Sequence, residues 1–112
     1  MTEPRLRTNL WISAQIRLCD LAFIPAVVAR RGDSDAGQVI VLRNFLNGTF
    51  ELFARTTDLN GSPAWRRLSG PDPVNYEAVE KIIGREAEFD PDVWVLEVED
   101  RDSKYNLDAP VI

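Results

Sequence analysis

The sequence predicts a two-layer α+β fold: a mostly antiparallel five-stranded sheet with two helices, in the order α-β-β-β-β-α-β. Three observations lead to this prediction. Residues 8–22 and 75–89 place apolar side chains at helical spacing, whereas several shorter runs are rich in β-branched residues. Asn47-Gly48 joins two apolar runs, as in a β-hairpin. Turns that contain glycine or proline separate the remaining runs.

The first helical segment is expected to begin at Thr8, whose hydroxyl makes it a suitable N-cap. Its apolar residues form one broad stripe, composed of Leu10, Trp11, Ala14, Leu18, Leu21 and Ala22 and widened by Ile12, Ile16 and Cys19. Residues 12–18 also alternate apolar and polar side chains at period two. A strand therefore remains the alternative for this segment.

The next segments predict strands. Residues 23–31 contain a β-prone run after Pro25, which is tolerated at the start of a strand. The turn-forming residues 32–37 lead directly into the hairpin over residues 39–56. Because both connections are short, we expect a meander of three antiparallel strands, with a fourth strand at 65–68 paired to the third.

The Asn47-Gly48 turn fixes the expected register of the hairpin, because a type I′ turn has two central residues. One face then supplies the core, and Leu42 lies opposite Phe53 on the other face. The residues predicted for this second face are Ile40, Leu42 and Phe53, with Val93 and Val95 from the last strand. If both helices pack on the first face, this set forms an apolar interface with a second copy. The alternative is that the first helix covers it.

The second helix is expected to run from residue 74 or 75 to about residue 89, where Asp90-Pro91-Asp92 ends it. Residues 93–100 predict the last strand. We expect the whole chain of 112 residues to form a single domain, with a loose arm at 1–7 and a tail at 103–112.

The chain has a net charge of −5, which is divided unevenly along it. The first 67 residues hold nine arginines and six acidic residues, whereas the rest holds four basic and twelve acidic residues. We expect the two parts to attract each other, or to attract the opposite parts of a second copy. Because the total is acidic, nucleic acid is not expected as a main partner.

The sequence contains no histidine and a single cysteine, Cys19. This composition excludes an intrachain disulfide, a cysteine zinc cluster and histidine-based catalytic triads. No apolar run reaches the roughly 20 residues that span a bilayer, so no membrane partner is expected. The first residues lack the apolar region of a secretory signal, and we expect a cytoplasmic protein.

Five motifs, in this order, resemble a known family: Arg5-Leu6-Arg7-Thr8, Arg30-Arg31-Gly32-Asp33, Asn47-Gly48-Thr49, Gly70-Pro71-Asp72-Pro73 and Phe89-Asp90-Pro91-Asp92. Together with Leu10-Trp11, Ala36-Gly37 and the segment 94–101 they cover nearly the whole chain. The sequence is similar to a family of short alphaproteobacterial proteins catalogued as domain of unknown function 1491. The resemblance implies a bacterial cytoplasmic protein and supplies no activity, ligand or catalytic residue.

Short acidic segments are the first candidate sites. Asp33-Ser34-Asp35 resembles the start of a calcium loop, but Gly37 and Asn44 stand where further ligands belong. We therefore expect no metal and, without a complete phosphate-binding loop, no nucleotide cofactor. The carboxylates that remain candidates for catalysis are Asp33, Asp35, Asp90 and Asp92.

Arginines are the second candidate site. Arg30, Arg31, Arg66 and Arg67 could bind an anion if their strands lie near one another. The alternative is that they pair across strands with Glu51, Glu97 and Glu99. The first functional hypothesis is therefore a non-enzymatic module that binds another protein or forms a homodimer. Its alternatives are a nucleic-acid or anion-binding protein with a basic patch on the sheet, which would include Arg43 and Arg55, and a carboxylate-dependent enzyme.

Overall fold

The computed structural model describes residues 7–112, so the arm expected at residues 1–7 lies outside the described residues except for Arg7. The elements are α1 (Thr8–Leu21), β1 (Ala26–Arg30), β2 (Val39–Asn44), β3 (Phe50–Thr57), β4 (Pro63–Arg67), α2 (Tyr76–Phe89) and β5 (Trp94–Glu99). The predicted α+β fold with two helices and five strands is confirmed. The first segment is a helix and not the alternative strand.

The two helices begin differently. Asn75 caps α2, because its side-chain oxygen accepts a hydrogen bond from Ala78 N at 3.0 Å. Thr8 was expected to cap α1 but is its first helical residue, and Arg7 holds the cap position without a side-chain hydrogen bond. The Thr8 hydroxyl donates to Gly37 O at 3.1 Å and so fixes the start of α1 to the loop before β2.

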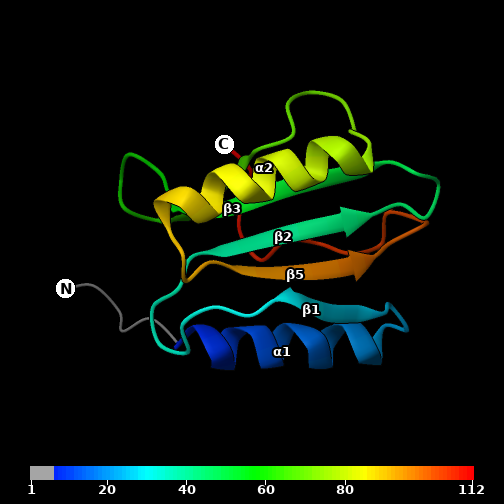
Figure 1. The fold of residues 1–112 in the computed structure, drawn as a ribbon. Helices are drawn as coiled ribbons and strands as arrows, with labels where there is room; N and C mark the ends of the chain where they lie inside the picture. The colour runs from blue at the N-terminus through cyan, green and yellow to red at the C-terminus, as the bar shows by residue number, and fades with distance from the viewer. Residues whose placement is uncertain (1–6) are drawn as a thin grey trace.

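The strand order is β1-β5-β2-β3-β4, with β5 antiparallel to β1 and parallel to β2 (Figure 1). The expected meander is therefore wrong, because β5 separates β1 from β2. The physical reason is that β5 carries apolar residues on both of its faces, which suits a central strand. The other strand pairs are antiparallel, and the expected pairing of β4 with β3 is confirmed.

The helices pack on opposite faces of the sheet, so the fold has three layers instead of the expected two. On the first face, here called the α1 face, Trp11, Ile12 and Cys19 pack against the sheet. On the second, the α2 face, Val79 is the fully buried residue of the helix. In Figure 1, α2 lies in front of β3 and α1 runs beneath β1.

The hairpin between β2 and β3 differs from the predicted register by one residue. Its loop is Leu46-Asn47-Gly48, one residue longer than a type I′ turn. Arg43 therefore lies opposite Glu51, not opposite Leu52 as predicted. The longer loop is favoured because it places the Arg43 guanidinium 3.3 Å from a carboxylate, where the predicted register would place it against an apolar side chain.

This shift moves Phe53 to the α1 face, where it lies opposite Val41. The other four residues of the predicted interface, Ile40, Leu42, Val93 and Val95, lie on the α2 face beneath the helix. All five side chains are at most 3% exposed. The predicted interface is therefore part of the interior, and a dimer of this protein would need a different surface.

The two edge strands of the sheet, β4 and β1, differ in whether another segment of the chain pairs with them. Residues 110–112, at the end of the segment 103–112 expected as a tail, lie along the outer edge of β4, where Trp65 N donates to Pro110 O and Ile112 N donates to Trp65 O. These bonds satisfy the backbone groups of Trp65 at this edge. At the other edge β1 remains exposed, and Val27 is 57% accessible.

Arg43 is the centre of a polar network beside β5. Its Nη1 lies 3.3 Å from Glu51 Oε1, and its Nη2 donates to Tyr105 O at 2.6 Å. Its Nε lies 3.3 Å from Asp100 Oδ2, as an ion pair without hydrogen-bond geometry. The buried Asp100 carboxylate also accepts bonds from Lys104 N and Tyr105 N. The network fixes the path of the chain after β5.

We expect Asp100→Ala to lower the free energy of unfolding by about 3 kcal/mol, because it removes one partner of a buried ion pair. The change also leaves two backbone N–H groups without their acceptor. Urea unfolding measures the loss, with the exposed Asp102→Ala as control. Equal stabilities of the two variants would contradict the role given to Asp100.

Tyr105 makes stability depend on alkaline pH. Burial raises the pKa of its hydroxyl, to which Cys19 and Asp108 add smaller effects. The folded state therefore favours the neutral phenol, so this stabilisation is complete below the unfolded pKa of about 10 and declines as the pH rises above it. Urea unfolding between about pH 8 and pH 11 should show a steeper loss for the wild type than for Tyr105→Phe. Parallel losses would show that Tyr105 does not cause the pH dependence.

Candidate binding groove

A groove of about 380 Å³ opens between α2 and β1 on the α2 face. A helix is about 10 Å wide and strands are about 4.8 Å apart, so one helix covers about two strands. In Figure 1, α2 lies over β3 and leaves the β5 and β1 side of this face without a helix. The α2–β1 groove is therefore a direct result of packing one helix on this face of a five-stranded sheet.

The floor of the groove is apolar and rigid. It consists of Leu42 and Val95 from the sheet and Val79 from α2, all at most 3% exposed. The walls combine the short side chains of Ala29 and Ala87 with larger ones, which include Tyr76 and Ile83 of α2. Because the floor residues are almost fully buried, a bound molecule would contact mainly the side chains of the walls.

Gly84 lines the groove from the middle of α2. A glycine inside a helix costs about 1 kcal/mol relative to alanine, so its presence needs a reason. A Cβ added at Gly84 would have no atom within 4 Å, which means that packing within the chain does not require glycine there. Its φ is also not in the left-handed region. What glycine does provide at this position is open space in the groove.

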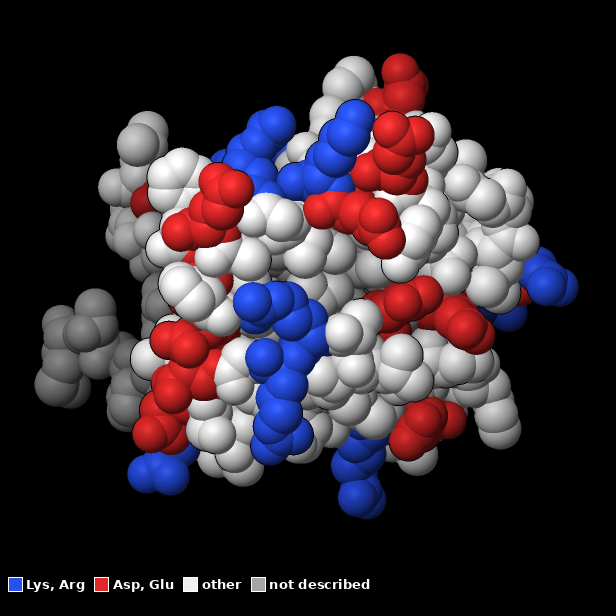
Figure 2. Space-filling view, viewed as in Figure 1, with Lys and Arg blue, Asp and Glu red and all other residues white. Residues whose placement is uncertain are grey.

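Charged groups of opposite sign stand at the two ends of the groove. Arg30 Nη1 donates to Pro91 O at 3.0 Å and to Val93 O at 2.7 Å, so the guanidinium is fixed beside the first residues of β5. Glu97, two residues along β5 from the partner of Arg30, lines the other end together with Glu80. Figure 2 shows a central basic column on this side of the molecule with acidic groups on both sides.

The edge of β1 beside the groove has unpaired backbone groups. Glu99 N donates to Pro25 O, so the N–H and C=O groups of Ala26 and Val28 point away from β5. Among the described residues, no hydrogen bond reaches these groups. A bulge between Val28 and Arg30 shortens the regular part of this edge.

The arginines predicted to bind an anion are divided between two places. Arg30 and Arg31 lie at the end of β1, whereas Arg66 and Arg67 lie on β4, at the opposite edge of the sheet. All four have local partners, and those of Arg30 are the Pro91 and Val93 carbonyls. Arg31 lies 5.4 Å from the Trp94 ring, Arg66 pairs with Glu86 at 3.7 Å, and Arg67 pairs with Glu51 at 3.5 Å. The alternative of cross-strand pairing is confirmed for Arg67 with Glu51.

The two aspartate segments do lie together, since Asp33 N donates to Asp92 O at 3.1 Å. Their carboxylates hold turns: Asp33 Oδ2 accepts from Asp35 N, and Asp90 Oδ1 accepts from Asp92 N. They do not line the groove. Within residues 7–112 no three acidic or cysteine side chains are grouped as a metal site would require.

A second cavity, of about 190 Å³, lies between α1 and β4. Trp11 and Trp65 both donate their indole N–H to the Asp108 carboxylate at 2.9 Å. The polar groups of this cavity therefore hold the C-terminal segment in place. Across the described part of the chain, neither helix has the length and apolar character needed to cross a membrane.

The comparison with known families agrees with this fold. A family model described as "Protein of unknown function (DUF1491)" matches residues 6–108. The chain belongs to the DUF1491 family. The resemblance inferred from the sequence motifs is therefore confirmed.

Solved structures extend the likeness of this DUF1491 chain. A crystal structure of a DUF1491 family protein from Caulobacter crescentus CB15 has 36% identity and a TM-score of 0.83, with 96% of this chain and 100% of that chain covered. An NMR structure of a DUF1491 family protein from the same organism has 37% identity and a TM-score of 0.76, covering 98% and 99%. The solution structure of Atu0922 from A. tumefaciens has 25% identity, a TM-score of 0.72 and 86% coverage of each chain. No curated protein matches the chain.

Sequence reasoning did not find the groove in this DUF1491 chain. The sequence predicts Arg30 as an anion contact, but it predicts the α2 residues beside Arg30 only as part of an amphipathic helix. The available signal was Gly84, a glycine in an otherwise strong helical pattern. The pairing of β5 beside β1, which forms the sheet side of the groove, has no local signal in the sequence.

We expect Gly84→Ala to raise the free energy of unfolding by about 1 kcal/mol, because the new Cβ meets open space and alanine favours the helix. Urea unfolding of the purified protein measures the change. Gly48→Ala is the contrasting variant, because Gly48 has φ +86° and alanine is strained there. A loss of stability in Gly84→Ala would mean that glycine serves the fold itself.

Proposed function

We propose that this DUF1491 protein is a non-enzymatic protein-binding module whose α2–β1 groove binds an amphipathic helix of a partner protein. The observation that carries the proposal is Gly84, which costs helix stability and keeps the groove open without serving any contact in the chain. This loss of helix stability at Gly84 is consistent with a function in which another backbone must come close to α2.

The shape of the groove supports a helix as the occupant. The uncovered part of the α2 face spans β5 and β1, a width of about 10 Å that matches one helix. A helix placed there would lie beside α2, where Gly84 and Ala87 allow two helix axes to come close. Its apolar face would cover Val27, which is 57% exposed.

The charges define the chemistry of the partner. Glu80 and Glu97 at one end favour a lysine or arginine on the bound helix, and Arg30 at the other end favours an acidic residue. A second copy of α2 fits poorly, because an antiparallel pair centred on Gly84 would place Glu80 opposite Glu88.

The alternatives receive less support. The four arginines lie at opposite edges of the sheet, so they do not form one basic patch for an anion or a nucleic acid. The carboxylates predicted for an enzyme hold turns outside the groove. A cytoplasmic location in an alphaproteobacterium belongs to the same proposal, supported by relatives from Caulobacter and Agrobacterium and by the buried free Cys19.

The test is a selection from a displayed library of helix-biased peptides about 20 residues long, enough for about 30 Å of helix. We expect the selected peptides to repeat apolar residues at helical spacing with one basic residue, and to lose binding to Gly84→Leu. Leucine at this position favours the helix but fills the groove. Lys81→Leu, on the exposed side of α2, should leave binding unchanged.

A charge variant refines the test. Glu80→Lys should weaken the selected peptides about tenfold by opposing their basic residue. Peptides that bind the wild type and Gly84→Leu equally well would show that the groove is not the binding site. Selected peptides without helical spacing would show that the occupant is extended, as expected if it paired with the free edge of β1.

A further inference from the structure

The outer surface of α1 carries an apolar stripe that the chain leaves in solvent. Trp11, Ile12 and Cys19 face the core. Leu10, Leu18 and Leu21 of the predicted apolar stripe are instead 53%, 59% and 69% exposed, and Ala14 between them is also exposed. Positions 10, 14, 18 and 21 follow one line along a helix, so these residues form a continuous strip, here called the α1 stripe.

We propose that the α1 stripe is a homodimer interface, in which α1 packs antiparallel on α1 of a second copy. The stripe is self-complementary. Ala14 stands at its centre with Leu10 four residues before it and Leu18 four residues after it. A two-fold axis at Ala14 therefore places each Leu10 opposite Leu18 of the partner, and the small alanine lets the helices approach closely.

The charges at the ends of α1 also favour an antiparallel partner. A helix is stabilised by acidic residues at its N-terminus and basic residues at its C-terminus. The first turn of α1 has no acidic residue and its last turn has no basic residue. Instead Arg7 stands at the N-terminus and Asp20 in the last turn, which are the unfavourable positions for their signs.

Antiparallel pairing reverses this effect. With the two-fold axis at Ala14, Arg7 of each copy comes to the level of Asp20 and Leu21 of the other. Each guanidinium then lies near the negative end of the partner helix, whereas Asp20 is on a different side of α1 from Ala14. The Arg7 charge, which opposes the dipole of its own helix, thus becomes favourable across the interface, and this favours a second copy placed antiparallel.

Phe23 adds an independent observation at the end of the stripe. It occupies the left-handed region with φ +59°, where glycine is usual after a helix, and its side chain is 94% exposed. Ile24 N donates to Cys19 O and Phe23 N to Asp20 O, the pattern of a helix end that favours glycine. Neither the backbone nor the core explains an aromatic residue there.

The test is sedimentation of the full chain from about 5 to about 500 µM, where mass action reveals a weak dimer. We expect the wild type to show a mass that rises with concentration to that of a dimer. Leu18→Glu should weaken the dimer about a hundredfold, because it places a charge opposite the partner's Leu10. Ser13→Glu adds the same charge on the polar side of α1 and should dimerise as the wild type does.

Charge-reversal variants at the ends of α1 distinguish a contribution to the dimer from a contribution to the stability of the monomer. Asp20→Arg should stabilise the monomer against urea, since a basic residue in the last turn agrees with the helix dipole. Arg7→Asp should weaken the dimer, because it places an acidic group near the negative end of the partner helix, and it also removes the ion pair of Arg7 with Asp35 within the monomer.

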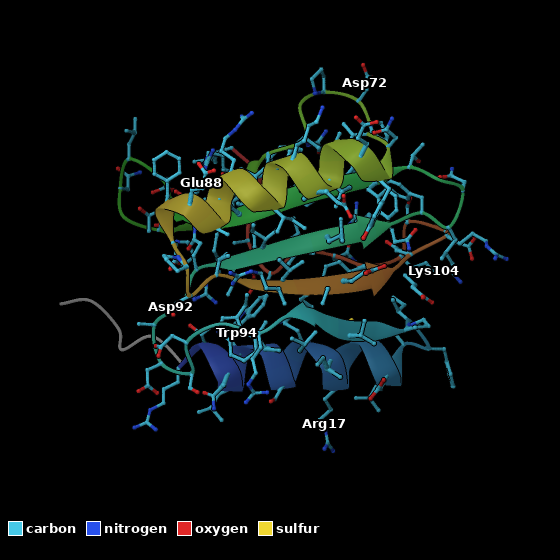
Figure 3. All side chains as sticks on the ribbon, viewed as in Figure 1. Arg17, Asp72, Glu88, Asp92, Trp94 and Lys104 are labelled. Carbon is cyan, nitrogen blue, oxygen red and sulfur yellow. The ribbon has the colours of Figure 1, made fainter. Side chains whose placement is uncertain are left out.

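A cysteine introduced on the proposed two-fold axis tests how the two copies of α1 are placed. Ala14→Cys should form a disulfide-linked dimer under mild oxidation, whereas Ser13→Cys, on the polar side of α1, should not. Arg17, which points away from the protein (Figure 3), lies beside the stripe and stays unchanged in this test. Native Cys19 does not interfere, because burial raises its thiol pKa and shields it.

A wild type that remains monomeric at the highest concentration would overturn the proposal. So would a Leu18→Glu variant that dimerises like the wild type. Gly84→Leu should leave the dimer unchanged, so failure here and failure of the groove remain separate results.

Discussion

The insertion of β5 between β1 and β2 is the constraint on which the rest of the structure depends. β5, the last strand in the sequence, lies at the centre of the sheet. The loop between β1 and β2 must therefore pass around the first residues of β5. Gly32 and Gly37 in this loop lie against Asp92 O and the Trp94 ring, where a Cβ would collide. The same insertion gives the groove its sheet side, because Val95 and Glu97 of β5 lie between Leu42 of β2 and Ala29 of β1.

The local part of this fold could be predicted from the sequence, and the non-local part could not. Both helices and all five strands follow from periodicity and from turn residues, because these signals act over a few neighbours. The position of β5 was missed because short connections favour pairing of consecutive strands, and here burial on both faces decided otherwise. The hairpin register was missed because Asn47-Gly48 also fits a three-residue loop, and the pairing of Arg43 with Glu51 selects that loop.

The candidate surfaces were missed for a related reason. An amphipathic pattern shows that a helix has an apolar side, but it does not show how much of that side the sheet covers. For α1 the apolar arc is wider than one sheet contact, so Leu10 and Leu18 remain outside. For α2 the sheet covers Val79, whereas the flank at Gly84 stays open and Tyr76 and Phe89 at its two ends are exposed. Only the packing of each helix on its face of the sheet separates these cases.

The two proposed surfaces lie on opposite faces of one sheet, and this arrangement has a consequence for binding. A dimer formed through the α1 stripe would leave the α2 face of each copy open, so the assembly would present two α2–β1 grooves. Two linked sites bind a partner with two matching helices more tightly than either site alone, provided that the partner spans the distance. Weak single grooves would then be sufficient for stable binding, which agrees with a small groove of about 380 Å³ and a short exposed edge at β1.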